Sequence, residues 1–171
     1  MRGLVVGRFQ PFHKGHLSVI RECLGRCDEL IVVIGSAEES HTMRNPFTAG
    51  ERFQMILSCL TPEERLRILI VPLRDVNRYS VWVNHIESYL PPFDIVFSNS
   101  ELTRSLFKHA GYEVRRTKAY NVKEYSATVI RRKIVSGKKW QNLVPEPVAR
   151  MLEGMDARQR LLDSGEKAEK L

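Results

Sequence analysis

The residues best suited to chemistry lie together near the start of the chain, between residues 7 and 16. His13 and His16 are three positions apart, so on one helical turn both imidazoles can face the same point. Gly7 allows close approach to the backbone, and Gly15 lets a phosphate chain lie against it. A helix beginning here also presents unpaired N–H groups to an anion. These features together predict a polyphosphate-binding segment without any acidic residue.

This segment also admits two other interpretations. A single histidine at a helix start usually acts as a cap or a satisfied polar group, and this alternative weakens when two histidines flank a glycine. An H-x-x-H pair can also chelate zinc, but neither the cysteine spacing nor a nearby carboxylate supplies the remaining ligands, so no metal site is expected. The chain contains no G-x-x-x-x-G-K-[ST] phosphate loop.

A second candidate segment lies late in the chain, at residues 125–131. Ser126 can cap a helix, Thr128 can donate a hydroxyl hydrogen bond, and Arg131 follows one turn later. The planar guanidinium of Arg131 suits a phosphate group. Taken alone, the segment is equally well explained as an ordinary helix cap followed by a basic helix.

The order of predicted elements indicates how these segments are positioned. Strands are expected at residues 3–7, 30–34, 66–71, 94–97 and 112–115. Helices are expected at residues 15–27, 48–60, 81–90 (capped by Ser80), 101–110, 127–135 and 145–155. Strands and helices therefore alternate about five times. This predicts a Rossmann-like α/β fold, with a parallel sheet of about five strands, helices on both faces and ligands beyond the carboxyl ends of the strands.

Composition limits the other possibilities. The chain has 171 residues and a net charge of +7, with 43% hydrophobic residues. We expect one domain over residues 1–155 and a charged tail, residues 156–171, that is frayed or disordered. No apolar run is long enough to span a membrane and the first residues lack a signal-peptide layout, so a cytoplasmic protein with reduced thiols is expected, without a membrane partner. Most of the late basic residues are interpreted as a solvated face.

The two candidate segments resemble signatures of a known superfamily. His13-Lys14-Gly15-His16 resembles the (H/T)-x-G-H signature of nucleotidyltransferases, and Ser126 to Arg131 resembles their S-x-T-x-x-R signature. The longer run G-R-F-Q-P-F-H-K-G-H is similar to archaeal-type NMN (nicotinamide mononucleotide) adenylyltransferases. The resemblance covers about residues 1–150. It implies catalytic roles for His13, His16 and Arg131, and ATP binding by Gly7, Arg8, Phe9, Gln10, Gly15, Tyr125, Ser126 and Thr128.

The resemblance also implies residues for the second substrate. The run R-N-P-F-T-A-G-E-R, beginning at Arg44, is similar to a family segment after the second strand, and the segment around Trp82 resembles one whose tryptophan stacks on the nicotinamide ring. For Trp82, a core position on an amphipathic helix stays an equal alternative. The implied NMN-binding residues are Gly35, Ser36, Arg44, Asp75, Trp82 and Asn99, although Ser98-Asn99-Ser100 stands where the family often has Ser-Gly-Asn. Glu51, Arg52 and His85 are interpreted as structural.

The implied reaction is transfer of AMP from ATP to NMN, giving NAD and pyrophosphate, with Mg²⁺ accompanying ATP. The resemblance also implies a homo-oligomer such as a hexamer. One alternative is a related transferase acting on phosphopantetheine, FMN or a phospho-alcohol. The other is a non-catalytic nucleotide sensor or basic nucleic-acid binder; the chain shows no interleaved aromatic and basic motif of RNA-binding modules, so no nucleic-acid partner is expected.

Overall fold

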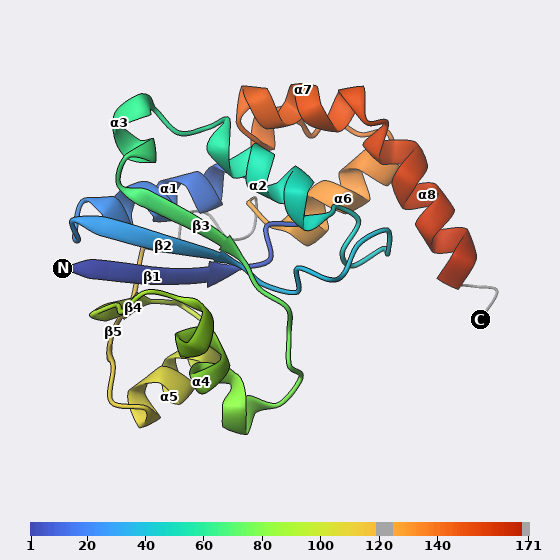
Figure 1. Ribbon diagram of the computed structural model, residues 1–171. Helices are drawn as coiled ribbons and strands as arrows, with labels where there is room; N and C mark the ends of the chain where they lie inside the picture. Colours follow the sequence, from blue (N-terminus) through green and yellow to red (C-terminus); the bar gives the residue numbers. More distant parts are fainter. Residues whose placement is uncertain (119–124, 169–171) are drawn as a thin grey trace.

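The computed structural model describes residues 1–118 and 125–168 and contains one five-stranded sheet (Figure 1). The strands are β1 (Arg2–Gly7), β2 (Glu29–Ile34), β3 (Ile68–Pro72), β4 (Ile95–Phe97) and β5 (Glu113–Arg115). All pairings are parallel, in the order β3-β2-β1-β4-β5. This confirms the expected fold class. The chain order reverses between β1 and β4, and such a switch point leaves room for a ligand at the carboxyl ends of the strands.

Helices cover both faces of the sheet because successive residues of each strand point to opposite sides. Val5, Val32 and Ile34 belong to the larger apolar cluster, whereas Leu4 and Val33 belong to the smaller one. The larger cluster packs under α1 (Lys14–Leu24), α2 (Ala49–Leu57), α6 (Ala127–Val135), α7 (Glu146–Gly154) and α8 (Ala157–Ala168), with the 3₁₀ turn η1 (Gln141–Leu143). On the opposite face lie α4 (Tyr79–Tyr89) and α5 (Glu101–His109) (Figure 1).

Two local features were not expected. The short helix α3 (Pro62–Arg65) follows α2, and its first turn is closed by a capping box between Thr61 and Glu64. Ser80 was expected to cap the next helix, but α4 begins at Tyr79 and its N-cap residue, Arg78, makes no side-chain capping bond. Helix propensity alone revealed neither the short helix α3 nor the earlier start of α4.

The tail differs most from expectation. Residues 157–168 form helix α8, and its Ala157 and Leu161 are buried in the larger cluster, Leu161 with 0% of its surface exposed. The expectation of a frayed or disordered tail is therefore wrong for these residues, because one apolar side chain per turn is enough to hold the helix on the core. Residues 169–171 of the tail lie outside the described residues.

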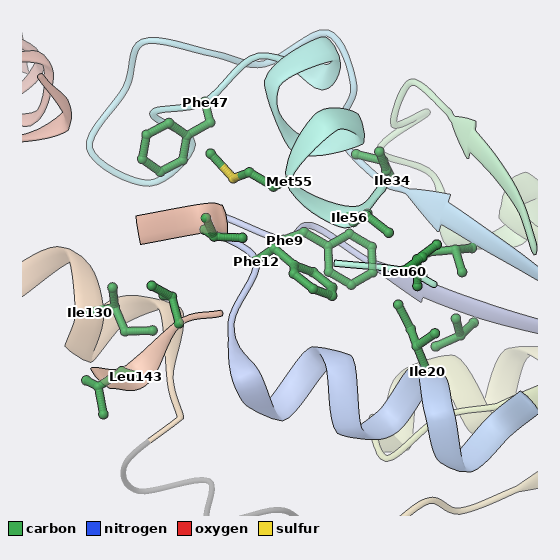
Figure 2. Packing of buried hydrophobic residues seen from close by; sticks show 14 of the residues in the cluster. Phe9, Phe12, Ile20, Ile34, Phe47, Met55, Ile56, Leu60, Ile130 and Leu143 are labelled. Atoms are coloured by element: carbon green, nitrogen blue, oxygen red, sulfur yellow. The ribbon is translucent and has the colours of Figure 1, made fainter. Parts of the chain in front are cut away.

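The larger cluster also anchors the turn after β1. Phe9 and Phe12 point into it, between α1 and α2 and close to Ile20, Ile34 and Ile56 (Figure 2). Both rings are buried, so the backbone between β1 and α1 is fixed by packing as well as by hydrogen bonds. No helix in the described part of the chain is long and apolar enough to cross a membrane.

Candidate active site

The turn between β1 and α1 is built around two glycines, for reasons the sequence did not reveal. A Cβ at Gly7 would lie 2.7 Å from the Phe9 ring, whose residue has a positive φ of 55°. A Cβ at Gly15 would lie 3.0 Å from the Cβ of Tyr125 and 3.1 Å from Nδ1 of His13. Protein side chains, rather than an approaching ligand, therefore fill the space that these glycines leave open.

Gln10 is part of the scaffold of this turn. Its side-chain amide donates to the Phe47 carbonyl at 2.9 Å, and its side-chain oxygen accepts from the Phe47 N–H at 2.9 Å. The side chain is only 2% exposed, and these two bonds link the turn to the segment before α2. The expected ATP-binding residues Gln10 and Phe9 thus use their side chains inside the protein, although both still line the cleft described next.

The two histidines are locked by reciprocal bonds at the start of α1. Nδ1 of His13 accepts from the His16 N–H at 3.2 Å, and Nδ1 of His16 accepts from the His13 N–H at 3.3 Å. The rings stack with centroids 3.4 Å apart. Because a backbone N–H can only donate, each Nδ1 must be unprotonated, and a neutral ring then carries its proton on Nε2. In each ring Nδ1 therefore serves the helix cap, as the capping alternative states, and Nε2 is the atom left for the predicted phosphate contact.

Burial keeps both rings neutral. It lowers the pKa of His13 to about 4, and the pKa of His16 lies well below its usual value because of burial and the charge of His13. Desolvation disfavours the charged form of an imidazole, and one charged ring would repel the other. At neutral pH each histidine therefore offers an Nε2–H donor without a formal charge.

A cleft of about 270 Å³ joins the histidines to the late segment. Its lining includes His13, His16, Ser126, Thr128 and Arg131. Arg131 is held in place because it donates to the Gln10 carbonyl at 2.7 Å and to the Thr128 hydroxyl at 3.4 Å. Ser126 is the N-cap residue of α6 as expected, but its side chain makes no capping bond. The first N–H groups of α6 are thus not capped by that hydroxyl.

The electrostatics of the cleft favour an anion. Burial lowers the pKa of Arg131, and Arg8 and Arg44 lower it further by charge repulsion. Burial and Arg44 likewise lower the pKa of Arg8. Three guanidinium groups that repel one another are stabilised when a multiply charged anion binds between them.

A wider, two-part cleft lies across the same edge of the sheet. Its two parts measure about 600 and 400 Å³ and share Arg8, Ser36, Asp75, Trp82 and Ser100. Arg44 lines the first part, and Gly7 and Gly35 line the second. Arg8 also lines the histidine cleft, so it marks the place where the two clefts meet. The structure thus brings together the residues expected for both substrates, with three exceptions, although Gly7, expected at ATP, lines the wider cleft instead of the histidine cleft.

The exceptions are Asn99, Tyr125 and Gly15, none of which lines a cleft at this edge. The side-chain amide of Asn99 donates to the Thr117 hydroxyl at 2.9 Å, and its oxygen accepts from the Thr117 N–H at 3.2 Å. Asn99 lines neither cleft, so its expected contact with NMN is not supported; its neighbour Ser100 lines the wider cleft instead. Tyr125 packs behind Gly15 and likewise does not line the histidine cleft.

Trp82 combines the two interpretations that the sequence left open. It is half-buried, and its ring meets Phe107 edge-on with centroids 5.5 Å apart. The same side chain lines both parts of the wider cleft. Trp82 therefore packs against the smaller apolar cluster on one side and lines the cleft on the other.

Several lining residues were missed by sequence reasoning. They are Glu39, Asn45, Asn77, Tyr79, Leu102, Thr103 and Leu106. Asn77 and Tyr79 follow β3 and Thr103 follows β4, so their position after the carboxyl end of a strand was the available signal. His85 also lines the second part of the wider cleft, while its Nε2 lies 3.0 Å from the Arg74 carbonyl oxygen.

The structure confirms that Arg52 has a structural role. It is 0% exposed and donates to the carbonyls of Arg8 (3.0 Å), Gly35 (2.8 Å) and Ser36 (3.1 Å). These bonds tie the ends of β1 and β2 to α2. Glu51 likewise closes the capping box of α2 with Thr48.

The described residues contain no group of three or more His, Cys, Asp and Glu side chains that could hold a metal ion. A cation at this site would therefore depend on oxygen atoms brought by a ligand, as is usual for magnesium with nucleotide phosphates. The arginine-rich cleft fits a cation that arrives already bound to an anion.

A parallel sheet that reverses its order beside the first strand, with anion-binding side chains at that edge, defines the class of Rossmann-like nucleotidyltransferases. The family model described as cytidylyltransferase-like matches residues 4–133. The chain is 48% identical over 168 residues to a nicotinamide-nucleotide adenylyltransferase of Archaeoglobus fulgidus, covering 95% of this chain and 97% of the relative. It is 45% identical over 161 residues to that of Methanococcus aeolicus, covering 94% and 93%. The chain belongs to the nicotinamide-nucleotide adenylyltransferases of the cytidylyltransferase-like family.

A solved structure supports the same fold. A bifunctional NMN adenylyltransferase/ADP-ribose pyrophosphatase of Francisella tularensis, in complex with AMP and a manganese ion, aligns with a TM-score of 0.77 and 25% sequence identity. The alignment covers 95% of this chain and 51% of the other. The present chain thus spans about half the length of that two-activity protein.

Proposed function

We propose that this protein transfers the adenylyl group of ATP to nicotinamide mononucleotide, giving NAD and pyrophosphate. The observation that carries the proposal is the meeting of two clefts at Arg8. One cleft has the paired imidazoles and Arg131, and the other has Trp82 and Arg44. Substrates bound in the two clefts would have their phosphates adjacent at Arg8. The activity of the curated relatives agrees with this assignment.

The chemistry needs no general base. A phosphate oxygen of NMN attacks the α-phosphorus of ATP, the bond from that phosphorus to the bridging oxygen breaks, and pyrophosphate leaves. The second pKa of a phosphomonoester is about 6, so the attacking oxygen is already ionised at neutral pH. The protein therefore contributes positioning and charge stabilisation.

Each basic side chain has a proposed position on the triphosphate. The Nε2–H groups of His13 and His16 donate to oxygens of the α- and β-phosphates, and Arg131 binds at the β- and γ-phosphates. His13 and His16 lie at the N-terminus of α1, whose backbone N–H groups add to the positive potential. Arg8 faces both clefts, so it can bind the attacking phosphate as well as the phosphate that is attacked.

The acceptor is proposed to bind in the wider cleft. Arg44 binds the NMN phosphate, and Trp82 provides an indole face for the cationic pyridinium ring. Such a cation–π contact contributes about 0.5–2 kcal/mol. Asp75 and Ser36 lie on the same wall and offer hydrogen-bonding groups to the ribose or the amide.

Magnesium is proposed to accompany ATP. The Francisella relative was solved with AMP and a manganese ion, and this supports the proposal of a divalent cation here. The cation would neutralise phosphate charge, while the clefts supply arginine and imidazole donors. Treatment with EDTA should stop turnover without changing the melting temperature of the nucleotide-free protein, and added Mg²⁺ should restore it.

The direct test measures pyrophosphate release from ATP with and without NMN, together with NAD formation by a coupled dehydrogenase. NMN should stimulate pyrophosphate release, with one NAD formed per pyrophosphate. The acid form of NMN, phosphopantetheine and FMN serve as alternative acceptors. Stimulation by FMN or phosphopantetheine instead of NMN would replace this proposal with a related transferase.

Substitution of Trp82 tests the acceptor side. For Trp82→Ala we expect the KM for NMN to rise by about 2- to 30-fold, the range that a lost cation–π contact implies. The KM for ATP should stay nearly unchanged. Trp82→Phe is the matched control, because it keeps an aromatic face and the packing against Phe107. An equal rise of both KM values in Trp82→Ala would support a purely core role.

The protein is further proposed to be a cytoplasmic homo-oligomer such as a hexamer. Leu66 is 87% exposed and Leu69, on the edge strand β3, is 46% exposed, which supports burial of this edge between subunits. Analytical ultracentrifugation would measure the state, and Leu69→Lys should weaken it. A monomer at micromolar concentration would contradict this part of the proposal.

A further inference from the structure

The inner side of helix α8 continues beyond the core toward the loop between β2 and α2. Leu161 is packed in the larger apolar cluster, and Ser164 is buried one turn later. Figure 1 shows the end of α8 alongside that loop. We call residues 37–47 the acceptor loop, because Glu39, Arg44 and Asn45 line the wider cleft.

One contact of α8 holds the backbone of the acceptor loop. The hydroxyl of Ser164 has one proton and two carbonyl acceptors, Arg160 in its own helix at 2.7 Å and His41 in the loop at 3.1 Å, so the tie to the loop is shared with a bond inside α8. His41 has a φ of 56°, in the left-handed region that a side chain other than glycine adopts only at a cost. Met43 of the loop lies near the same helix, since a Cβ built at Gly165 would lie 3.6 Å from its Sδ.

A second contact holds the point where the loop enters α2. Nη1 of Arg160 lies 2.8 and 2.7 Å from the two carboxylate oxygens of Glu51. Glu51 in turn accepts from the Thr48 N–H in the capping box. Burial alone would raise the pKa of Glu51, but the hydrogen bonds from Arg160 and from the Thr48 backbone outweigh it and lower the pKa. The guanidinium also lies 6.0 Å from the centre of the Phe47 ring.

The opposite end of the loop is tied to the far wall of the cleft. The carboxylate oxygens of Glu38 accept from the Asp75 N–H at 3.0 and 3.1 Å. The loop that carries Arg44 is therefore bonded to the segment after β3 at one end and to α8 at the other. Two further ties reach the loop: Arg52 of α2 donates to the Glu39 carbonyl at 3.5 Å, and the Gln10 side chain bonds the Phe47 backbone.

We propose that Arg160 and Ser164 are positioning residues for the acceptor subsite: they hold the acceptor loop in the conformation that places Arg44 in the cleft. This rests on the proposed function for the identity of the acceptor. Neither residue lines a cleft at the sheet edge. Their loss should therefore weaken NMN binding while the ATP subsite, built on α1 and α6, stays intact.

The test uses the full chain with the variants Ser164→Ala and Arg160→Gln. Each removes a hydrogen-bonded tie, so we expect the KM for NMN to rise by about three- to tenfold. The KM for ATP should change less than twofold. Ser164→Thr keeps the hydroxyl, so its KM for NMN should stay close to the wild-type value. Gln159→Ala is the control, because Gln159 is exposed on the same helix and its side chain bonds Asp163, its only partner within residues 1–118 and 125–168.

Hydrogen exchange provides a readout that does not depend on activity. In the free protein, amides of residues 37–47 should exchange faster in Ser164→Ala and Arg160→Gln than in the wild type or Gln159→Ala. Unchanged exchange of the loop in both variants would overturn the proposal, as would an equal rise of the KM for ATP and NMN. If the wild type makes no NAD, the proposed function fails, but the exchange experiment still decides whether α8 holds the loop.

Discussion

At the scale of single residues, the histidine pair shows how one side chain can serve structure and chemistry together. Each Nδ1 accepts a backbone hydrogen bond, which caps α1 and fixes the ring. Among the described residues, Nε2 of neither ring has a hydrogen-bond partner, and both histidines line the cleft. A substitution can therefore keep the cap while removing the donor.

His16→Gln and His13→Asn are such substitutions. Glutamine at the third helical position and asparagine at the N-cap both supply an accepting oxygen, so helix α1 should stay capped. Loss of an Nε2–H donor to the transition state should lower kcat by on the order of 10²-fold. Steady-state kinetics and circular dichroism would measure the two effects. Unchanged kcat would remove that histidine from the catalytic set.

The low pKa values of the histidines predict a pH dependence of stability. As the pH falls below 6.5, the unfolded chain binds protons at these rings, whereas folded His13 stays neutral until about pH 4. Stability should therefore fall between these pH values, by on the order of 3 kcal/mol for His13 alone. Urea denaturation of the wild type and of His13→Asn would measure this, and the variant should show the weaker dependence. Equal slopes would contradict a buried neutral imidazole.

At the scale of elements, the loops at the edge of the sheet are held by buried bonds. Arg52 donates to the carbonyls of Thr48, Arg8, Gly35 and Ser36, and its pKa is lowered mainly by burial. It therefore connects α2 to the turns after β1 and β2. This explains why a basic residue near a phosphate site need not bind phosphate.

For Arg52→Met we expect a loss of stability of about 3 kcal/mol or more, because several buried carbonyls lose their donors. Arg65→Met is the control, since Arg65 is exposed at the end of α3 and should change stability by less than about 0.5 kcal/mol. Chemical denaturation would give both values. If the two variants lost the same small amount, the carbonyl network would not contribute to folding.

The sequence predicted most elements because their signals are local. The apolar run at residues 30–34 became β2, and the Thr48–Glu51 capping box became the start of α2. Helix α8 was missed because it buries few apolar side chains, among them Ala157 and Leu161, within a strongly charged segment. Its stability depends on the core surface that it covers, which no local pattern reveals.

At the scale of the whole molecule, the site residues were predictable where they follow strands. His13, Ser36 and Asp75 follow three different strands whose carboxyl ends share one edge of the sheet. Asn99 also follows a strand, but its amide is taken by Thr117, which comes 18 residues later in the sequence. Such long-range pairing cannot be read from the segment itself. Arg8 was predicted at the ATP site, but its position where the two clefts meet also depends on residues that follow other strands.

We predict that residues through α8 unfold with the sheet as one cooperative unit. Leu161→Ala should lower stability by about 2–5 kcal/mol, the usual cost of truncating a fully buried leucine. Leu162→Ala is the matched control and should cost less, because Leu162 is only partly buried. Thermal unfolding followed by calorimetry would show a single transition in each case. A cost below 0.5 kcal/mol for Leu161→Ala would mean that α8 is an appendage.

The bond from Arg131 to the Gln10 carbonyl joins positions 121 residues apart. Both histidines leave the ribosome early, but the guanidinium that completes their cleft is made only after all five strands. A nascent or clipped chain that stops before α6 would carry the imidazoles without their partner. Such an incomplete chain should not bind ATP tightly. Fragments that cannot complete the reaction would therefore not hold the nucleotide.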